Sequence, residues 1–275
     1  MDRLETRLRK LKVEARFNRE IKWSELSPER ESFFLRFVDE FFDQFNRTNL
    51  RFRQIFSDRQ YVPVLAPDAP PLTPLDVQFR ICYQFLKLSF GLADFPNVPG
   101  ERQKIIIRLD NHSSSKHKRT LRGFVENLPN HFNRPDLDIT LGHVCSTSLV
   151  RIQAIDVLMG AAGNYGNKMH LRRPNGQRGM TPIQKARMNV AKHIYNKFRE
   201  IDNTTRGSRA FNWFESTGSC DSTRSALLQK LSIWKFHTKN YDIDKGWQND
   251  RLDSQGIYQG PDIQKVKTAA ESEWL

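Results

Sequence analysis

The alternation of apolar and polar positions predicts strands and helices that follow one another along the first 165 residues. Strands are expected at residues 50–56, 104–110 and 137–144, which alternate or form short β-branched runs. Helices are expected at residues 1–16, 27–46, 75–90, 116–128 and 149–162, where apolar side chains recur at helical spacing or form long apolar runs. From residue 50 onward, strands and helices alternate, which favours a largely parallel sheet with right-handed crossovers.

The chain changes character after residue 165. Residues 163–181 combine several glycines with basic side chains, so we interpret them as a mobile basic loop. Helices are expected at residues 182–199 and 223–239, separated by a stretch rich in Thr, Ser and Gly. We therefore expect an α/β domain at residues 1–165 and a basic loop with a helical extension at residues 166–275.

Composition adds a candidate partner. Lys and Arg number 44 against 31 Asp and Glu, a formal charge of +13, which is typical of proteins that bind nucleic acid. A soluble protein that is merely basic is the alternative. The three cysteines are widely spaced, which indicates neither a zinc site nor a disulfide framework and fits a cytoplasmic setting. No apolar stretch is long enough for a membrane span, so no membrane partner is expected.

Asp156 is the first candidate for chemistry, because it lies inside an apolar run that we predict to be a buried helix. A buried carboxylate needs a metal, a cation or hydrogen-bond donors to compensate it. Asp110 ends a predicted strand, and together the two aspartates could hold a divalent metal. The alternatives are a salt bridge from Asp156 to Arg108 or Arg151, and a plain strand-to-helix turn at Asp110.

Basic residues in two places are candidates for contacts with phosphates. One group lies at the start of the predicted helix 116–128, where free amides and positive charge suit a phosphate, and the other lies in the basic loop. These candidates are Lys116, Arg119, Arg172, Arg173 and Arg178. Arg51 and Arg53, on one side of a strand, could add further contacts. His112 and His117 could transfer a proton or contact phosphate. A solvated basic face is the alternative for the group at the start of the helix, and a solvated loop is the alternative for the two histidines.

Four pieces of the sequence recur in a recognisable order. They are Glu20-Ile-Lys-Trp-Ser24, Leu109-Asp110, the pair Ser146 and Ser148, and Ile152-Gln-Ala-Ile-Asp156 with Gly160. Over roughly residues 1–165 the chain resembles the family called domain of unknown function 3800. That resemblance implies a ribonuclease-H-like fold, with a mixed sheet flanked by helices, and a metal-dependent nuclease site that uses Mg²⁺ or Mn²⁺.

By this resemblance Glu20, Asp110 and Asp156 are metal-binding catalytic carboxylates, and Lys22 and Gln153 support them or contact substrate. A surface pair with Lys22 is the alternative for Glu20. Family members begin with a strand that ends in Asp-Glu-Ser-Gly, which this sequence does not contain, so we expect either a start farther upstream or a truncated member with weak activity. The predicted function is metal-dependent hydrolysis of nucleic-acid phosphodiesters. The alternatives are a non-catalytic nucleic-acid-binding protein and a subunit of a mobile-element or defence assembly.

Overall fold

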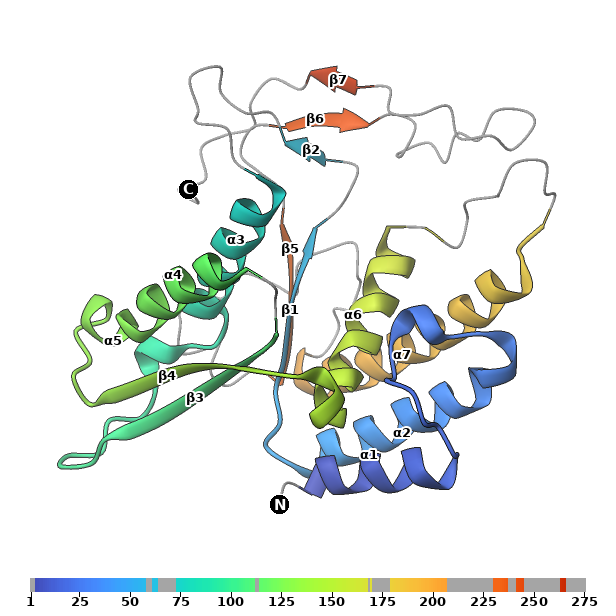
Figure 1. Ribbon diagram of the computed structural model, residues 1–275, viewed down its shortest axis with the longest axis horizontal. Helices are drawn as coiled ribbons and strands as arrows, with labels where there is room; N and C mark the ends of the chain where they lie inside the picture. Colours follow the sequence, from blue (N-terminus) through green and yellow to red (C-terminus); the bar gives the residue numbers. More distant parts are fainter. Residues whose placement is uncertain are drawn as a thin grey trace.

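A computed structural model describes residues 3–57, 61–63, 73–111, 114–167, 169, 179–206, 230–236, 241–244 and 263–265. These residues form a mixed α/β arrangement (Figure 1). The helices are α1 (Arg3–Glu14), α2 (Glu31–Arg47), α3 (Pro74–Ser89), α4 (Ser115–Glu126), α5 (Leu128–His131), α6 (Val150–Gly166) and α7 (Pro182–Arg206). The strands are β1 (Phe52–Ser57), β2 (Tyr61–Pro63), β3 (Gln103–Asp110), β4 (Leu137–Val144), β5 (Leu231–Phe236), β6 (Tyr241–Asp244) and β7 (Ile263–Lys265). Short 3-10 turns are η1 (Trp23–Glu25), η2 (Pro28–Arg30), η3 (Leu92–Asp94) and η4 (Ser146–Ser148).

The described strands form three separate sheets rather than one continuous sheet. Strands β1 and β5 are parallel, and β3 and β4 are parallel in continuous register from Gln103 opposite Leu137 to Asp110 opposite Val144. Strands β2, β6 and β7 form a small antiparallel sheet. The parallel pairing of neighbouring strands was predicted, whereas the expected single mixed sheet is not seen among the described residues.

The prediction of a helix at residues 223–239 is wrong where the structure describes that range. Residues 231–236 form β5, and the rest of the predicted helix, apart from Lys230, lies outside the described residues. Leu231 and Ile233 are buried in the same core as Phe52 of β1. Pairing with β1 and burial in the core therefore determine the conformation of this segment, and the pairing depends on a partner about 180 residues away in the sequence.

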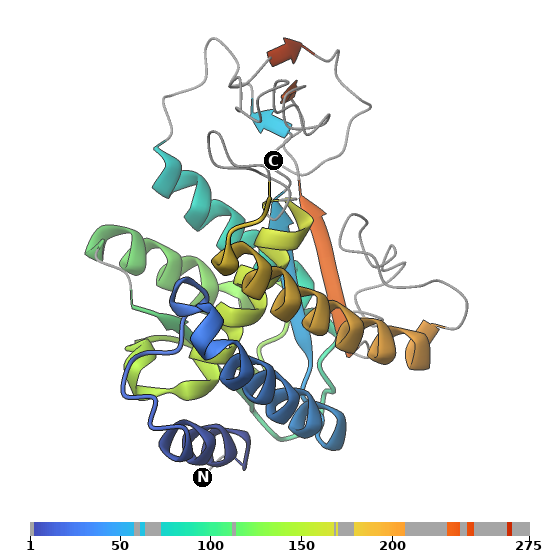
Figure 2. The same cartoon turned by 90° about the vertical axis from the view of Figure 1, so that its right-hand side faces the viewer.

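One hydrophobic core holds together what we call the body, which comprises α1, α2, β1, α6, α7 and β5. Helix α2 has a phenylalanine at almost every inward position, and these side chains are nearly all buried. Phe198 of α7 joins the layers, because its ring lies 5.2 Å from the rings of both Phe42 in α2 and Phe52 in β1. Figure 2 shows α2 and α7 running side by side.

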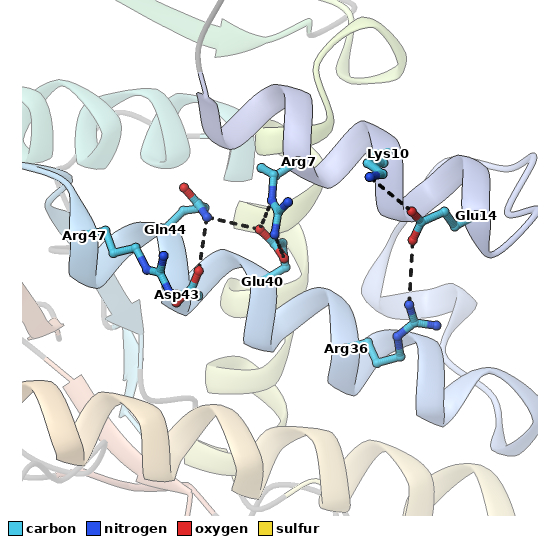
Figure 3. Close-up of polar contacts among 8 residues, drawn as sticks. All are labelled: Arg7, Lys10, Glu14, Arg36, Glu40, Asp43, Gln44 and Arg47. Carbon is cyan, nitrogen blue, oxygen red and sulfur yellow. Dashed lines mark hydrogen bonds and ion pairs between the residues drawn. The ribbon is translucent and has the colours of Figure 1, made fainter.

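Helix α1 packs on α2 as its apolar stripe predicts. Leu4, Leu8 and Leu11 are buried in the body core. A row of polar contacts follows the outer edge of this interface (Figure 3), including an ion pair of 2.9 Å between Arg7 Nε and Glu40 Oε1. Exposed ion pairs contribute little to stability, so the leucines hold the helix in place.

A second hydrophobic core defines what we call the sheet region, which comprises α3, α4, α5, β3 and β4. Leu137, Ile139 and Leu141 of β4 are buried beneath the helices, and alternate residues of β3 are partly buried against the same cluster. The other face of β3 is exposed and carries Ile106 and Asp110. The sheet is therefore covered on one face only. In Figure 1 this region lies on the opposite side of the β1–β5 pair from α6 and α7.

Candidate acidic site

The segment between α1 and η2, which we call the strap (residues 19–25), is fixed to one stripe of α6. The backbone amide of Ile21 donates to Gln153 Oε1 at 2.9 Å, and the amide of Trp23 donates to Asp156 Oδ2 at 2.8 Å. One turn farther along α6, Gly160 lies under the Trp23 side chain. Positions 153, 156 and 160 share one helix face, so the two sequence motifs form a single docking arrangement.

Gly160 is required by close approach. A Cβ atom at this position would lie 2.3 Å from both Cβ and Cγ of Trp23, which is far inside contact distance. Gly163, three residues farther along the same helix, has open space where its Cβ would be. A glycine is therefore needed at position 160 to let Trp23 of the strap pack against α6, whereas position 163 could hold a larger residue.

Gln153 connects the strap to the end of the sheet region. Its side chain is 1% exposed, accepts from Ile21 and donates from Nε2 to the carbonyl oxygen of Ser146 at 2.8 Å. The amide of Ser146 in turn donates to Asp110 Oδ1 at 3.2 Å. A buried amide with both ends bonded fixes the relative positions of three segments. The carboxylate at the end of β3 is thereby tied to the turn before α6.

Glu20 and Lys22 project from the strap on the side away from the core. The backbone at Lys22 is extended, and Ile21 between them is completely buried, so its two neighbours point outward. Lys22 Nζ lies 2.9 Å from Glu20 Oε2. The ion pair between Glu20 and Lys22, which was the alternative for Glu20, is therefore present in the structure.

The charges of this site act on one ammonium group. Hydrogen bonding and attraction from Glu20 raise the pKa of Lys22, and the negative charges of Asp156 and Asp110 add to the effect. Partial burial raises the pKa of Glu20, but hydrogen bonds from Ser146 and Lys22 outweigh it, so the pKa lies below its usual value. Glu20 thus contacts Lys22 directly, and the charges of Asp110 and Asp156, from two distant segments, act more weakly on the same ammonium group.

Asp156 is exposed, and the prediction that it is buried is wrong. Helix α6 turns Gln153, Ala154, Val157 and Leu158 inward, whereas Ile155, Asp156 and Met159 face outward. The apolar run suggested burial because Ile155 and Met159 are exposed despite their character, at 40% and 50%. The partner that the structure gives this carboxylate is the backbone of Trp23.

The predicted phosphate contacts are only partly described. Lys116 and Arg119 are exposed on the first turns of α4, after the Ser114 cap. Arg172, Arg173 and Arg178 lie outside the described residues.

Arg53 cannot face solvent as expected. It is 8% exposed, and its guanidinium donates to the backbone carbonyls of Ser89, Phe52 and Lys230. The same buried contacts join β1 of the body to the end of α3.

His117 belongs to a hydrogen-bonded chain instead of a solvated loop. Its Nε2 lies 2.9 Å from Asp76 Oδ1, and its Nδ1 lies 2.6 Å from Ser114 Oγ. Hydrogen bonds from Thr73 and His117 hold the pKa of Asp76 well below its usual range. This chain joins α3 to the start of α4. His112 lies outside the described residues.

Glu5 is a structural residue of the site that sequence reasoning missed. Its carboxylate is 5% exposed and accepts from the amides of Val150 and Arg151, both at 3.0 Å, so α1 supplies the cap for α6. Arg9 Nε lies 2.7 Å from the same carboxylate. The signal was a glutamate next to Leu4 and Leu8 on the apolar stripe of α1.

The donors of the site suit a hard cation. Among the described residues, Asp110 Oδ2 and Asp156 Oδ1 accept no hydrogen bond, and carboxylate oxygens are the ligands that Mg²⁺ and Mn²⁺ prefer. In the described part of the chain, however, no three His, Cys, Asp or Glu side chains come close enough to hold a metal ion as they stand. A metal would require the carboxylates to turn toward one another and Lys22 to leave Glu20.

Comparisons with known families, curated proteins and solved structures find no match for this chain. Within the described residues no helix is both long and apolar enough to cross a membrane.

Proposed function

We propose that the chain is a metal-dependent hydrolase of nucleic-acid phosphodiesters, with its site at Glu20, Asp110 and Asp156. One observation carries the proposal: the negative charges of carboxylates from the strap, from the end of β3 and from α6 all act on the ammonium of Lys22. Their three negative charges exceed the positive charges of Lys22 and of Lys12, which also acts on Glu20, and this excess favours the entry of a divalent cation. The ribonuclease-H-like relationship of the fold is part of the same proposal.

Each residue has a distinct role in this proposal. The three carboxylates would hold Mg²⁺ or Mn²⁺, which when bound supplies an activated water and stabilises charge on the phosphate. Lys22 contacts a phosphate oxygen once it leaves Glu20. Gln153 holds the strap and the Ser146 turn in place. Lys116 and Arg119, with Arg172, Arg173 and Arg178, hold the nucleic-acid backbone without reading its sequence.

A non-catalytic nucleic-acid-binding protein is the second candidate, and one observation favours it. Glu20 already has a close cation in Lys22, and the described carboxylates are not gathered at metal-binding distances. In that case the basic residues named above as phosphate contacts would bind nucleic acid, and the acidic site would only stabilise the strap.

The two candidates are separated by measuring cleavage and binding with the same labelled DNA and RNA. Cleavage is followed with Mg²⁺, with Mn²⁺ and with a chelator, for the wild type and for Asp156→Asn. The matched control is Asp138→Asn, because Asp138 is an exposed aspartate on β4, outside the acidic site. For the hydrolase, we expect metal-dependent cutting that falls by at least ~100-fold in Asp156→Asn, in line with the loss of catalytic charge stabilisation, and is retained in Asp138→Asn.

Binding is measured in parallel by fluorescence anisotropy at several salt concentrations. Salt-sensitive binding that is equal in all three proteins, without metal-dependent cutting, would support the binding protein and reject the hydrolase. Cutting that is unchanged in Asp156→Asn would show that the reaction takes place elsewhere in the chain.

A further inference from the structure

A pocket of about 480 Å³ lies where α1 leads into the strap, beside the first turns of α2. Four arginines line it, Arg16, Arg19, Arg30 and Arg36, against one carboxylate, Glu29. The volume is in the range of small-ligand sites. Glu20, Lys22, Asp110 and Asp156 do not line this pocket, so it is a separate feature, although Arg19, the first residue of the strap, belongs to its lining.

Arg30 is fixed before any ligand arrives. Its guanidinium carbon lies 5.4 Å from the centroid of the Phe17 ring, and that ring stacks on Phe33 with centroids 4.6 Å apart. Arg30 Nη1 also donates to Glu25, to Oε2 at 2.7 Å and to the backbone oxygen at 3.2 Å. A guanidinium held on an aromatic floor loses little conformational freedom when it binds an anion.

Arg16 stands at the end of α1 in a left-handed backbone conformation, with φ of 50°. Glycine is the usual residue at such a position. Two hydrogen bonds hold the turn, from the amide of Arg16 to Val13 and from the amide of Phe17 to Lys12. Among the described residues Arg16 forms no ion pair, and its side chain lines the pocket.

Arg36 is only weakly paired. Its Nη2 lies 3.9 Å from Glu14 Oε2, as Figure 3 shows, and its side chain is 62% exposed. Arg19 shares the single carboxylate of Glu25 with Arg30, at 3.4 Å. A hydrogen bond with Ser27 lowers the pKa of Glu29, which therefore stays charged, but it is the only acid in the lining. The pocket thus has an excess of guanidinium groups over carboxylates.

We propose that this pocket binds the phosphate or pyrophosphate group of a ligand. Guanidinium groups match phosphate oxygens in geometry and charge, and several of them around one concave surface select a compact, multiply charged anion. The group could belong to a small phosphorylated molecule or to the terminal phosphate of a nucleic-acid strand. The inference does not depend on the proposed hydrolase activity, because it uses none of the three carboxylates of the acidic site and does not use Lys22.

The test is calorimetric titration of the full chain with inorganic pyrophosphate at constant ionic strength. The variant is Arg16→Gln with Arg36→Gln, and the matched control is Arg47→Gln. Arg47 is on the same helix as Arg36, has the same 62% exposure and lies outside the pocket lining. We expect saturable one-site binding that weakens by at least ~10-fold in the double variant, as expected when charge-assisted hydrogen bonds are lost, and stays unchanged in the control.

A second titration uses an oligonucleotide with a terminal phosphate and the same strand without it. A preference for the phosphorylated strand that disappears in the double variant assigns the ligand to a nucleic-acid end, whereas binding of pyrophosphate alone assigns it to a small molecule. Absence of saturable pyrophosphate binding overturns the inference, and so does an equal loss in the variant and the control, which would indicate bulk charge. Thermal unfolding checks that each protein is folded, and Arg36→Gln alone keeps the test valid if the double variant does not fold.

Discussion

The body and the sheet region are stabilised by different kinds of hydrophobic core. The body surrounds its core with helices on several sides, and that core contains fully buried phenylalanines such as Phe34, Phe42 and Phe198. The sheet region has a smaller, mostly aliphatic core, and its two strands are covered on one face only. A two-stranded parallel sheet with an open face has little independent stability. The sheet region therefore depends on its helices and on its contacts with the body.

The acidic site lies where these two regions meet. Asp110 comes from the sheet region, whereas Glu20 and Asp156 come from the body. The hydrogen bond from the amide of Ser146 to Asp110 is one tie between the regions. A site of this kind is complete only when both regions are folded and joined. Its geometry should therefore be more sensitive to the strap and the Ser146 turn than to any one core side chain.

The largest effects should come from the two cores. Phe34→Ala in the body should lower the free energy of unfolding by ~3–5 kcal/mol, and Leu141→Ala in the sheet region by ~2–3 kcal/mol, because a half-covered sheet can relax around the lost volume. Urea unfolding followed by circular dichroism measures both. Phe124→Ala is the control, because Phe124 is 57% exposed and its loss should change stability by less than ~1 kcal/mol.

The comparison fails if Leu141→Ala destabilises the chain more than Phe34→Ala. It is sharpened if Leu141→Ala produces a separate early transition, since that would show that the sheet region unfolds before the body.

A smaller effect is expected where the strap meets α6. Gly160→Ala places a methyl group 2.3 Å from Trp23 and should cost ~1–3 kcal/mol, because either the strap or the helix must move. Hydrogen exchange at the amides of Ile21 and Trp23 reports the change directly, because both donate to α6 side chains. We expect protection of these two amides to fall while protection inside α2 is retained.

Gly163→Ala is the matched control on the same helix. Its Cβ would meet nothing within 4 Å, so alanine should stabilise α6 by ~0.5–1 kcal/mol. If the two substitutions have the same effect, close packing of Trp23 on Gly160 is not what holds the strap.

Local sequence patterns predicted most of the helices and strands. They failed where a contact with a segment distant in the sequence determines the structure. The strands at 104–110 and 137–144 and the helices around Leu8 and Phe37 agree with the structure within a few residues, since each has its own periodicity. Strand β5 was predicted as a helix because its partner β1 is distant. Asp156 was predicted to be buried because periodicity alone does not show which side of an apolar helix remains uncovered.

The sequence predicted which residues belong to the candidate site, but it did not predict the contacts that hold them in place. The motifs around Glu20 and Asp156 identified residues that the structure brings near Lys22. The contacts that position them are mostly backbone groups, such as the amides of Ile21, Trp23 and Ser146, and every residue has these groups. Side-chain identity therefore carries little information about these contacts. Glu5 was missed because it caps a helix distant in the sequence through backbone amides.

The smallest effect is expected inside the sheet region, where Asp76 joins α3 to α4. Its carboxylate accepts from Thr73 and His117, and these hydrogen bonds lower its pKa. Because the folded pKa lies below the unfolded value of ~3.9, the stabilisation is complete above that pH and is lost as the pH falls through the folded pKa. Asp76→Asn should therefore melt at a lower temperature than the wild type near neutral pH, and the difference should narrow as the pH is lowered below ~4. Melting curves at several pH values measure this, with Asp138→Asn on the open face of β4 as the control. A difference that stays constant down to the lowest pH would show that the negative charge of Asp76 does not contribute to the stability of the chain.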